Sequence, residues 1–186
     1  MFEFCETKLP GCFLIKPRIF SDIRGEFVKT FHSKEYVKHG LESVFVEDFY
    51  TTSQKNVIRG LHLAKPPSSH VKTVSCVSGK IFDVLLDLRL GSPTFGQYAT
   101  FVLSSKNANI LYAPEGIAHG FCAMSDITIV QYKVSKTFCA EDDIGVLWSS
   151  AKIPWPTSNP ILSDRDMIFP ALADFASPFF FDKYQA

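Results

Sequence analysis

Short apolar runs alternate with turn residues along most of the chain. Residues 71–77 are rich in β-branched types, Ser78-Gly79-Lys80 interrupts them, and residues 81–88 resume the apolar pattern. Two such runs around a glycine-containing turn predict a β-hairpin or meander. Further strands are predicted at residues 98–103, 109–112 and 128–134. Many short strands at this spacing favour a β-sandwich or a closed β-barrel.

Turn and helix signals complete this picture. Gly91-Ser92-Pro93 and Pro114-Glu115-Gly116 predict turns between the strands. One helix is predicted over residues 33–39, with Ser33 as its N-cap and Gly40 just past its end. The proline-rich residues 153–160 cannot form a central strand, so we expect them to wrap the surface.

Length and aromatic content suggest one domain with an aromatic-rich interior or interface. A chain of 186 residues favours a single domain over residues 1–186, and its 18 phenylalanines are unusually many. The run Phe179-Phe180-Phe181, near Tyr184, would be costly to expose. We expect it to fold back on the barrel or to pack against a second subunit.

Charge and cysteine usage exclude several classes of partner. The 19 basic residues balance the 19 acidic ones, so no overall field attracts nucleic acid or an anionic membrane. No run approaches the roughly 18 apolar residues of a membrane span. Five scattered cysteines without a CxxC pair argue against a disulfide framework or a zinc knuckle. Acidic Glu3 and Glu6, without a basic and then apolar leader, indicate no signal peptide, so we expect a cytoplasmic protein with reduced thiols.

Residue types suited to catalysis recur at a few places, and each also has an ordinary structural interpretation. His62 ends a strand-like run, and a histidine in a strand is more often structural than catalytic. Lys72 would share a face with Val74 and Cys76, where its ammonium needs an anionic ligand or access to water at the strand end. The same argument applies to the hydroxyl group of Tyr132.

Pro114-x-Gly116-x-x-His119 resembles the second signature motif of the cupins. This resemblance implies an all-β cupin, or jelly-roll, β-barrel with a few short helices. The first cupin motif supplies His-x-His and Glu as metal ligands, but residues 62–79 contain neither. We therefore expect no metal and no cofactor.

Within the cupins, the chain resembles the dTDP-4-dehydrorhamnose 3,5-epimerase family over nearly its whole length. The matching stretches are residues 20–27, 57–62, 82–84, 87–89, 91–96, 118–121, 131–133 and 162–166. The resemblance implies epimerisation of a nucleotide-linked 4-keto-6-deoxyhexose at C3, C5 or both, in deoxysugar biosynthesis for surface polysaccharide. The C4 ketone acidifies the neighbouring C–H bonds, so a base, an oxyanion stabiliser and an opposed acid are needed.

The family pattern assigns these roles to residues of this chain. By resemblance, His62 is the base, oriented by Asp166; Lys72 stabilises the C4 oxyanion and Tyr132 is the acid. Arg59 would hold the diphosphate, and His119 would line the pocket. The other substrate-binding candidates are Phe20, Arg24, Glu47, Phe49, Phe138 and Arg165. Family members are dimers whose N-terminal strands cross, so Phe20 and Arg24 would contact the neighbouring subunit's nucleotide.

The chain also departs from the family pattern. Glu47-Asp48-Phe49 replaces Gln-x-Asn, and Lys29, Leu63-Ala64 and His70 replace an acid, Tyr-Gln and Gln. Because the catalytic set is kept while the base-recognition set changes, we hypothesise CDP or GDP in place of dTDP. Phe138 replaces a second tyrosine, which suggests inversion at one centre, with a slight preference for C3.

Three other classes remain as alternatives: a cupin ketoisomerase acting on the same kind of sugar, a metal-dependent cupin, and a non-enzymatic sugar-binding cupin. The retained set His62, Lys72, Tyr132 and Asp166 favours the epimerase.

Overall fold

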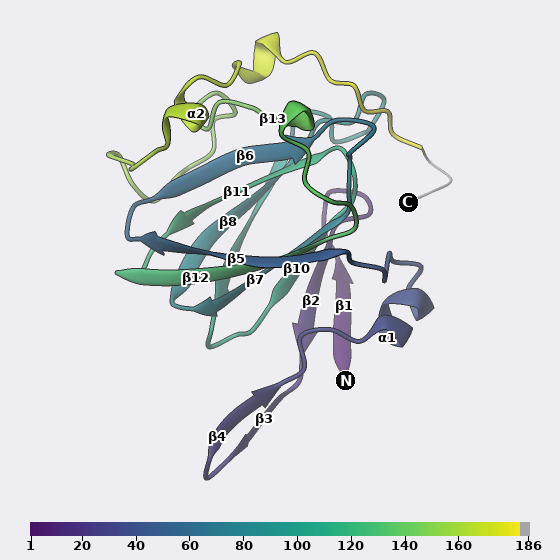
Figure 1. Ribbon diagram of the computed structural model, residues 1–186, viewed down its shortest axis with the longest axis vertical. Helices are drawn as coiled ribbons and strands as arrows, with labels where there is room; N and C mark the ends of the chain where they lie inside the picture. The colour runs from purple at the N-terminus through teal and green to yellow at the C-terminus, as the bar shows by residue number, and fades with distance from the viewer. Residues whose placement is uncertain (183–186) are drawn as a thin grey trace.

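Two antiparallel sheets face each other and form a barrel (Figure 1). The computed structural model describes residues 1–182. The first sheet has the order β1 (Phe2–Glu6), β2 (Phe13–Pro17), β10 (Ile110–Ala113), β7 (Lys72–Ser78), β12 (Ile127–Val134) and β5 (Glu47–Gln54). The second has the order β13 (Asp143–Gly145), β6 (Ile58–Ala64), β11 (Ile117–Ala123), β8 (Lys80–Asp87) and β9 (Tyr98–Ser104). The predicted all-β barrel is confirmed.

The main core fills the space between the sheets. Val74 and Val130 of the first sheet pack with Ile81, Leu85 and Phe121 of the second, all with at most 1% exposure. Side chains alternate between the two faces of a strand, so the apolar residues at every second position meet inside the barrel. Burial of this apolar surface is the main force that holds the sheets together.

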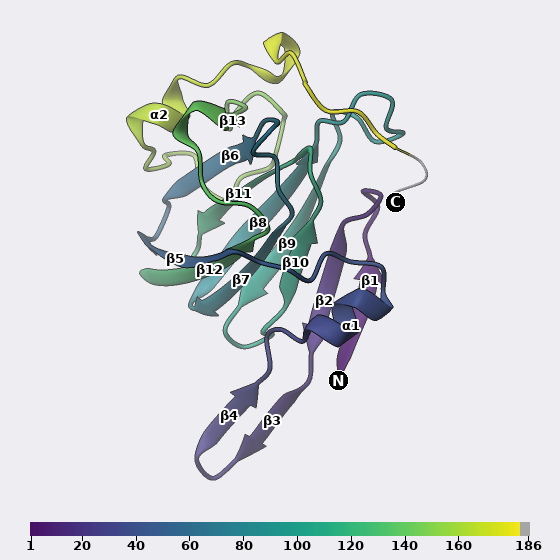
Figure 2. The same cartoon turned by 45° about the vertical axis from the view of Figure 1, so that its right-hand side comes forward.

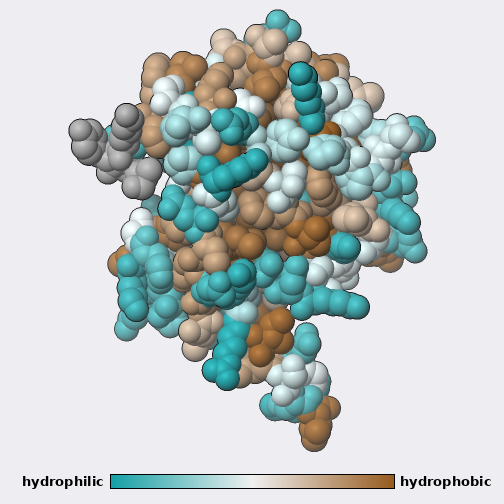
Figure 3. Space-filling view, turned by 180° about the vertical axis from the view of Figure 1, so that it is seen from behind, coloured by the Kyte–Doolittle hydropathy of each residue, from teal (hydrophilic) through white to brown (hydrophobic). Residues whose placement is uncertain are grey.

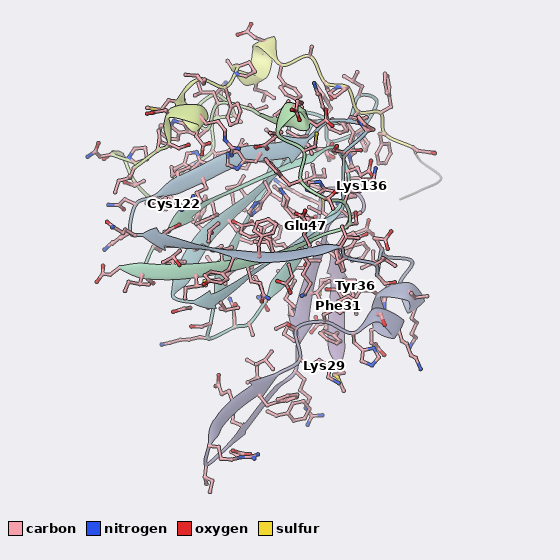
Figure 4. The ribbon with its side chains drawn as sticks, viewed as in Figure 1. Lys29, Phe31, Tyr36, Glu47, Cys122 and Lys136 are labelled. Atoms are coloured by element: carbon pink, nitrogen blue, oxygen red, sulfur yellow. The ribbon has the colours of Figure 1, made fainter. Side chains whose placement is uncertain are left out.

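Five of the 18 phenylalanines, together with Tyr36 and Tyr112, belong to a second apolar layer outside the first sheet. Helix α1 (Ser33–Lys38) places the buried Tyr36 over this layer, where its ring contacts Phe4, Phe31, Phe45 and Tyr112 edge-on. Such edge-to-face contacts add to the stability gained by burial alone. Figure 4 shows Phe31 and Tyr36 close to this helix, and the predicted aromatic-rich interior lies here.

The predicted hairpin between residues 71–77 and 81–88 is wrong, although both strands exist. β7 pairs with β10 and β12, whereas β8 pairs with β11 and β9, so the chain crosses between sheets at Gly79. Gly79 has φ +79°, and a Cβ there would lie 2.6 Å from the carbonyl oxygen of Ile127. The same short glycine turn that closes a hairpin here serves as the corner between two layers, and the local sequence does not distinguish the two.

Other local predictions are mostly confirmed. α1 lies where the helix is predicted, but its N-cap is His32, whose side chain makes no capping hydrogen bond, and Ser33 is the first helical residue. Residues 153–160 form no strand, as the proline content requires. The five cysteines are free. Two further short elements are the 3₁₀ turns Ala140–Asp142 and Leu172–Asp174.

The C-terminal phenylalanine run folds back on the barrel. Phe179 is 5% exposed and belongs to a further apolar cluster, which contains residues of β6, β8 and β11. The guanidinium group of Arg89 lies 5.0 Å from the ring centroid of Phe181. Phe180 between them is 77% exposed. Tyr184 lies outside the described residues.

One hairpin projects from the body of the molecule. Among residues 1–182, β3 (Ile19–Asp22) and β4 (Gly25–Val28) pair only with each other, and they extend beyond the barrel (Figures 1 and 2). Ile23 at its turn is fully exposed, and apolar surface is visible along this projection (Figure 3). Lys29 lies where the hairpin joins the body (Figure 4). Within residues 1–182 no helix combines the length and apolar character needed to cross a membrane.

Candidate active site

A cavity of about 450 Å³ opens at one end of the barrel. Its lining contains most of the candidate residues, drawn from both sheets and from the segment that follows them. The lining residues are Glu47, Phe49, Thr51, Arg59, His62, His70, Lys72, His119, Tyr132, Val134, Lys136, Phe138, Asp143 and Arg165. A larger hollow of about 770 Å³ lies beneath residues 178–182, but its lining holds no candidate catalytic side chain.

The most specific feature of the cavity is a histidine–carboxylate pair. His62 Nε2 lies 2.8 Å from Asp166 Oδ1, although 104 residues separate them in sequence. The second oxygen of Asp166 accepts a hydrogen bond from the backbone N–H of Gly60 at 3.0 Å. Although burial opposes ionisation, these hydrogen bonds lower the pKa of Asp166 to about 2. The carboxylate is therefore charged at neutral pH and fixes the orientation of the imidazole ring.

Local backbone structure places both partners. Asp166 lies in the single-turn helix α2 (Asp164–Met167), whose N-cap Ser163 accepts a hydrogen bond from the Asp166 N–H. Gly60, at φ +127°, approaches Gly120 of the neighbouring strand so closely that a Cβ would lie 2.6 Å from its Cα. This close approach lets β6 lie against β11 with His62 directly opposite His119.

His119 belongs to a second, fully buried pair. Its Nε2 lies 2.8 Å from Asp83 Oδ2, and both side chains are at most 4% exposed. The His119 ring also contacts the ring of Tyr132 edge-on, at 5.8 Å between centroids. His119 therefore forms the floor between the predicted base His62 and the predicted acid Tyr132. Burial raises the pKa of Asp83.

Lys72 is the first residue of β7, and it lines the cavity. Burial lowers the pKa of Lys72 to about 8, while Asp143 and Asp83 partly oppose this effect. Both features expected of Lys72 from the sequence are present, since it lies at a strand end and also lines the cavity. An ammonium group in so dry a place gains strongly from a nearby developing negative charge.

Tyr132 lies across the cavity floor on β12, with 7% of its surface exposed. It pairs with Phe49 of β5 in the sheet register, and the two rings stack at 5.0 Å with an interplanar angle of 18°. Burial raises the pKa of Tyr132. The phenol therefore keeps its proton at neutral pH, as a proton donor must.

The remaining cavity-lining candidates lie around the opening of the cavity. Arg59 donates to Ser53 Oγ at 3.0 Å and to the Thr52 carbonyl at 3.1 Å, so its guanidinium is held at the edge. Glu47 accepts a hydrogen bond from the backbone N–H of Phe138 at 2.9 Å and so ties this exposed ring to the rim. Figure 4 shows Glu47 and Lys136, both of which line the cavity.

Two predicted contacts lie elsewhere. Phe20 and Arg24 are on the projecting hairpin, where neither lines the cavity of its own chain. The Arg24 guanidinium pairs with Asp22 at 2.5 Å, and Phe20 contacts Phe27 and Arg18. Of the departures from the family pattern, His70, Glu47, Phe49 and Phe138 line the cavity, whereas Lys29, Leu63 and Ala64 do not.

Sequence reasoning missed several groups in or next to the cavity. Thr51, Lys136 and Asp143 line it. Asp83 lies behind the lining and acts through His119, and Asp143 acts on Lys72. The strand pattern offers one weak signal, because an acid at position 83 interrupts an otherwise apolar strand. Within residues 1–182 no cluster of three or more His, Cys, Asp or Glu side chains is placed to bind a metal ion.

A jelly-roll barrel of the cupin type therefore carries a site with the parts of an acid–base enzyme. The family model described as dTDP-4-dehydrorhamnose 3,5-epimerase matches residues 6–174. A Shigella flexneri dTDP-4-dehydrorhamnose 3,5-epimerase is 41% identical over 165 residues, which cover 87% of this chain and 91% of that protein. The chain belongs to the dTDP-4-dehydrorhamnose 3,5-epimerase family and is an isomerase of the epimerase type.

Solved structures agree with this assignment. The Bacillus anthracis dTDP-4-dehydrorhamnose 3,5-epimerase, with TDP and PPi bound, superposes with a TM-score of 0.89 at 41% identity and covers 92% of this chain and 99% of its own. ChmJ, a 3'-monoepimerase from Streptomyces bikiniensis in complex with dTDP-quinovose, superposes with a TM-score of 0.86 at 27% identity. The match covers 90% of this chain and 86% of ChmJ. The predicted cupin fold is confirmed.

Proposed function

We propose that this protein, as a single domain, inverts C3, C5 or both in a nucleotide-linked 4-keto-6-deoxyhexose. The observation that carries the proposal is the convergence of a carboxylate-oriented imidazole, an ammonium and a buried phenol on one cavity. Enolisation next to a ketone needs these three groups: a base, an oxyanion partner and an acid. Membership of an epimerase family supports the same reaction.

The hydrogen bonds of His62 support a choice of atoms for the first step. Asp166 engages Nε2 of His62, so Nδ1 is the nitrogen free to remove a proton from the carbon next to the ketone. The enolate oxygen at C4 then lies against the ammonium of Lys72. Tyr132 returns a proton to the opposite face, which inverts the centre, and solvent exchange resets both groups.

The nucleotide is a finer question. The relatives named above are dTDP-sugar enzymes, which supports a dTDP-linked substrate for this chain. CDP or GDP, inferred from the departures at Glu47 and Phe49, stays a prediction, and Phe49 lies beside the catalytic phenol. Calorimetry with dTDP, CDP and GDP tests it: a clear preference for CDP or GDP supports the prediction, and a preference for dTDP contradicts it.

Inversion at one centre is part of the proposal. Phe138 lines the cavity without the hydroxyl that the family pattern has at this position. A relative of this fold is described as a 3'-monoepimerase, which supports a reaction restricted to C3. We propose C3 as the preferred centre.

We also propose a cytoplasmic homodimer that acts in deoxysugar biosynthesis for surface polysaccharide. The projecting hairpin pairs with no other strand in the described part of its own chain, and the exposed fractions of Phe20, Ile23 and Phe27 are 40%, 105% and 62%. A partner subunit whose nucleotide site received this hairpin would cover these side chains. Sedimentation of wild-type protein and of a variant lacking residues 19–28 tests this, and a monomeric wild type would contradict it.

The experiment that tests the function is product NMR with a panel of nucleotide-4-keto-6-deoxyhexoses. Retention of the C4 carbonyl with inversion at C3 or C5 supports the epimerase. A carbonyl moved to C3 would identify a ketoisomerase instead. Tight binding without any exchange of C–H protons would identify a sugar-binding protein.

A further inference from the structure

Arg165 contacts the predicted base, His62, and two carboxylates near it, those of Asp143 and Asp166. Its Nη1 donates to Asp143 Oδ2, its Nε lies 3.5 Å from Asp166 Oδ1, and its Nη2 lies 2.8 Å from His62 Nε2. Its guanidinium also lies 5.6 Å from the ring centroid of Phe169, which contacts the His62 ring edge-on at 5.7 Å. The head of this side chain is therefore fixed next to the base, although 46% of the side chain is exposed.

The chemistry of these contacts is restrictive. A guanidinium has only N–H donors and keeps its charge at any working pH. His62 Nε2 can either donate to Asp166 or accept from Arg165, so the two neighbours compete for one nitrogen. When Nε2–H donates to Asp166, this N–H already lies beside the guanidinium, and Nδ1 is the nitrogen that takes the second proton. That proton makes the ring positive, and the nearby guanidinium charge opposes it. The contact therefore tolerates a neutral ring and disfavours an imidazolium.

Asp143 holds the guanidinium group of Arg165 beside His62. It lies on β13, which pairs with β6 so that Asp143 faces Ala64 and Gly145 faces His62. The backbone that carries Asp143 is thus fixed to the strand that carries the base. A salt bridge from this position anchors Arg165 and aims its remaining nitrogens at His62 and Asp166.

We infer that Arg165, anchored on Asp143, is a positioning residue for the base. It keeps the imidazole of His62 aligned with the carboxylate of Asp166, and it opposes a second proton on the imidazole. This inference rests on the proposed function of His62. It differs from the substrate-binding role that the sequence suggests for Arg165. In this role Arg165 acts through His62, so its loss changes proton affinity and turnover more than nucleotide binding.

The charged groups around His62 affect its pKa and therefore any pH titration of its ring. The titratable and charged groups that face it are Asp166 and Arg165 from α2, Lys72 from β7, His119 from β11 and Asp143 from β13. Burial lowers the pKa of His62, Asp166 opposes this effect, and the charges of Arg165 and Lys72 reinforce it. Removal of the Arg165 charge alone should therefore raise the pKa of His62.

The test compares R165M with R165K, which keeps the charge, and with K106M, which removes an exposed charge outside the cavity. The first readout is an NMR titration of the His62 ring, assigned with H62N, which requires no turnover. We expect His62 to titrate at higher pH in R165M and near its wild-type position in R165K and K106M.

The second readout is turnover. In R165M the acid limb of kcat/KM should move to higher pH and kcat should fall by about tenfold or more, while calorimetric binding of dTDP, CDP or GDP changes by less than about threefold. An unchanged His62 titration in folded R165M would overturn the inference, and so would a defect confined to nucleotide binding. Absence of epimerisation in the wild type would instead contradict the proposed function, because the NMR titration stands independently of it.

Discussion

The ring of Phe49 stacks on the ring of Tyr132 across the β5–β12 pairing, with centroids 5.0 Å apart. His119 contacts the same phenol from another side, at 5.8 Å. Tyr132 is therefore held between two rings and shielded from water, which raises its pKa. A departure from the family pattern thus supports the proposed proton donor directly.

Tyr132→Phe removes the proposed acid while it keeps the stacked ring. We expect kcat to fall by about 100-fold or more, since general acid catalysis contributes factors of this size. The thermal midpoint should change little. The matched control is Tyr50→Phe, because Tyr50 lies on β5 next to Phe49 in sequence and is 69% exposed. Comparable kinetics in the two variants would remove Tyr132 from its role.

Asp166→Asn tests the orienting carboxylate. It removes the acceptor that fixes Nε2 of His62, so turnover should fall strongly. Because the folded-state pKa of Asp166 is about 2, below its ordinary value of 3.8, the ionised group stabilises the protein at neutral pH. This contribution, about 2 kcal/mol, is present above pH 4 and is lost as the pH falls towards 2.

Chemical denaturation at several pH values measures this effect. The stability difference between wild type and Asp166→Asn should shrink on acidification from pH 5 to pH 2. Asp164→Asn, an exposed change in the same helix, serves as the control and should show no such trend. A difference that stays constant with pH would contradict the linkage.

The pH dependence of kcat/KM should be bell-shaped. The acid limb should lie below pH 6.5, because burial lowers the pKa of His62, and the base must be neutral to act. The alkaline limb should lie near pH 8, where Lys72 loses the charge that stabilises the enolate. Lys72→Arg keeps its charge, so in this variant the alkaline limb should move upward or disappear. A limb that stays near pH 8 in Lys72→Arg would exclude Lys72 as its source.

Phe138→Tyr restores the hydroxyl of the family pattern at the cavity rim. If its absence restricts the wild type to one centre, the variant should invert the second centre measurably faster. NMR detection of label from heavy water at C3 and C5 separates the two events. Phe180→Tyr, an exposed change outside the cavity, is the control. Equal labelling of both carbons in the wild type would contradict the single-centre proposal.

Local patterns in the sequence predicted the strands that carry the site better than their pairing. Val74 lies between Thr73 and Ser75, and Val130, Tyr132 and Val134 alternate with Gln131 and Lys133, so both strands are visible in sequence. The crossing at Gly79 is not, because a hairpin and a corner between sheets use the same turn residues. Pairing depends on non-local contacts that no short window of sequence contains.

The same distinction applies to the cavity. His62, Lys72, His119 and Tyr132 lie on strands, and the family motifs placed them in one cavity. The partners Asp83 and Asp143 were missed, since each becomes relevant only through a neighbour on another strand. The contact of Arg165 with His62 depends on where a four-residue helix docks, 103 positions further along the chain, which periodicity does not predict.

Deuterium uptake from heavy water into a nucleotide-4-keto-6-deoxyhexose, measured with wild-type protein and with His62→Asn, tests directly whether His62 removes the proton. We expect label next to the retained C4 carbonyl with the wild type, and loss of that labelling in folded His62→Asn. Labelling at an undiminished rate in His62→Asn would show that another group removes the proton, and the assignment of the base would be wrong.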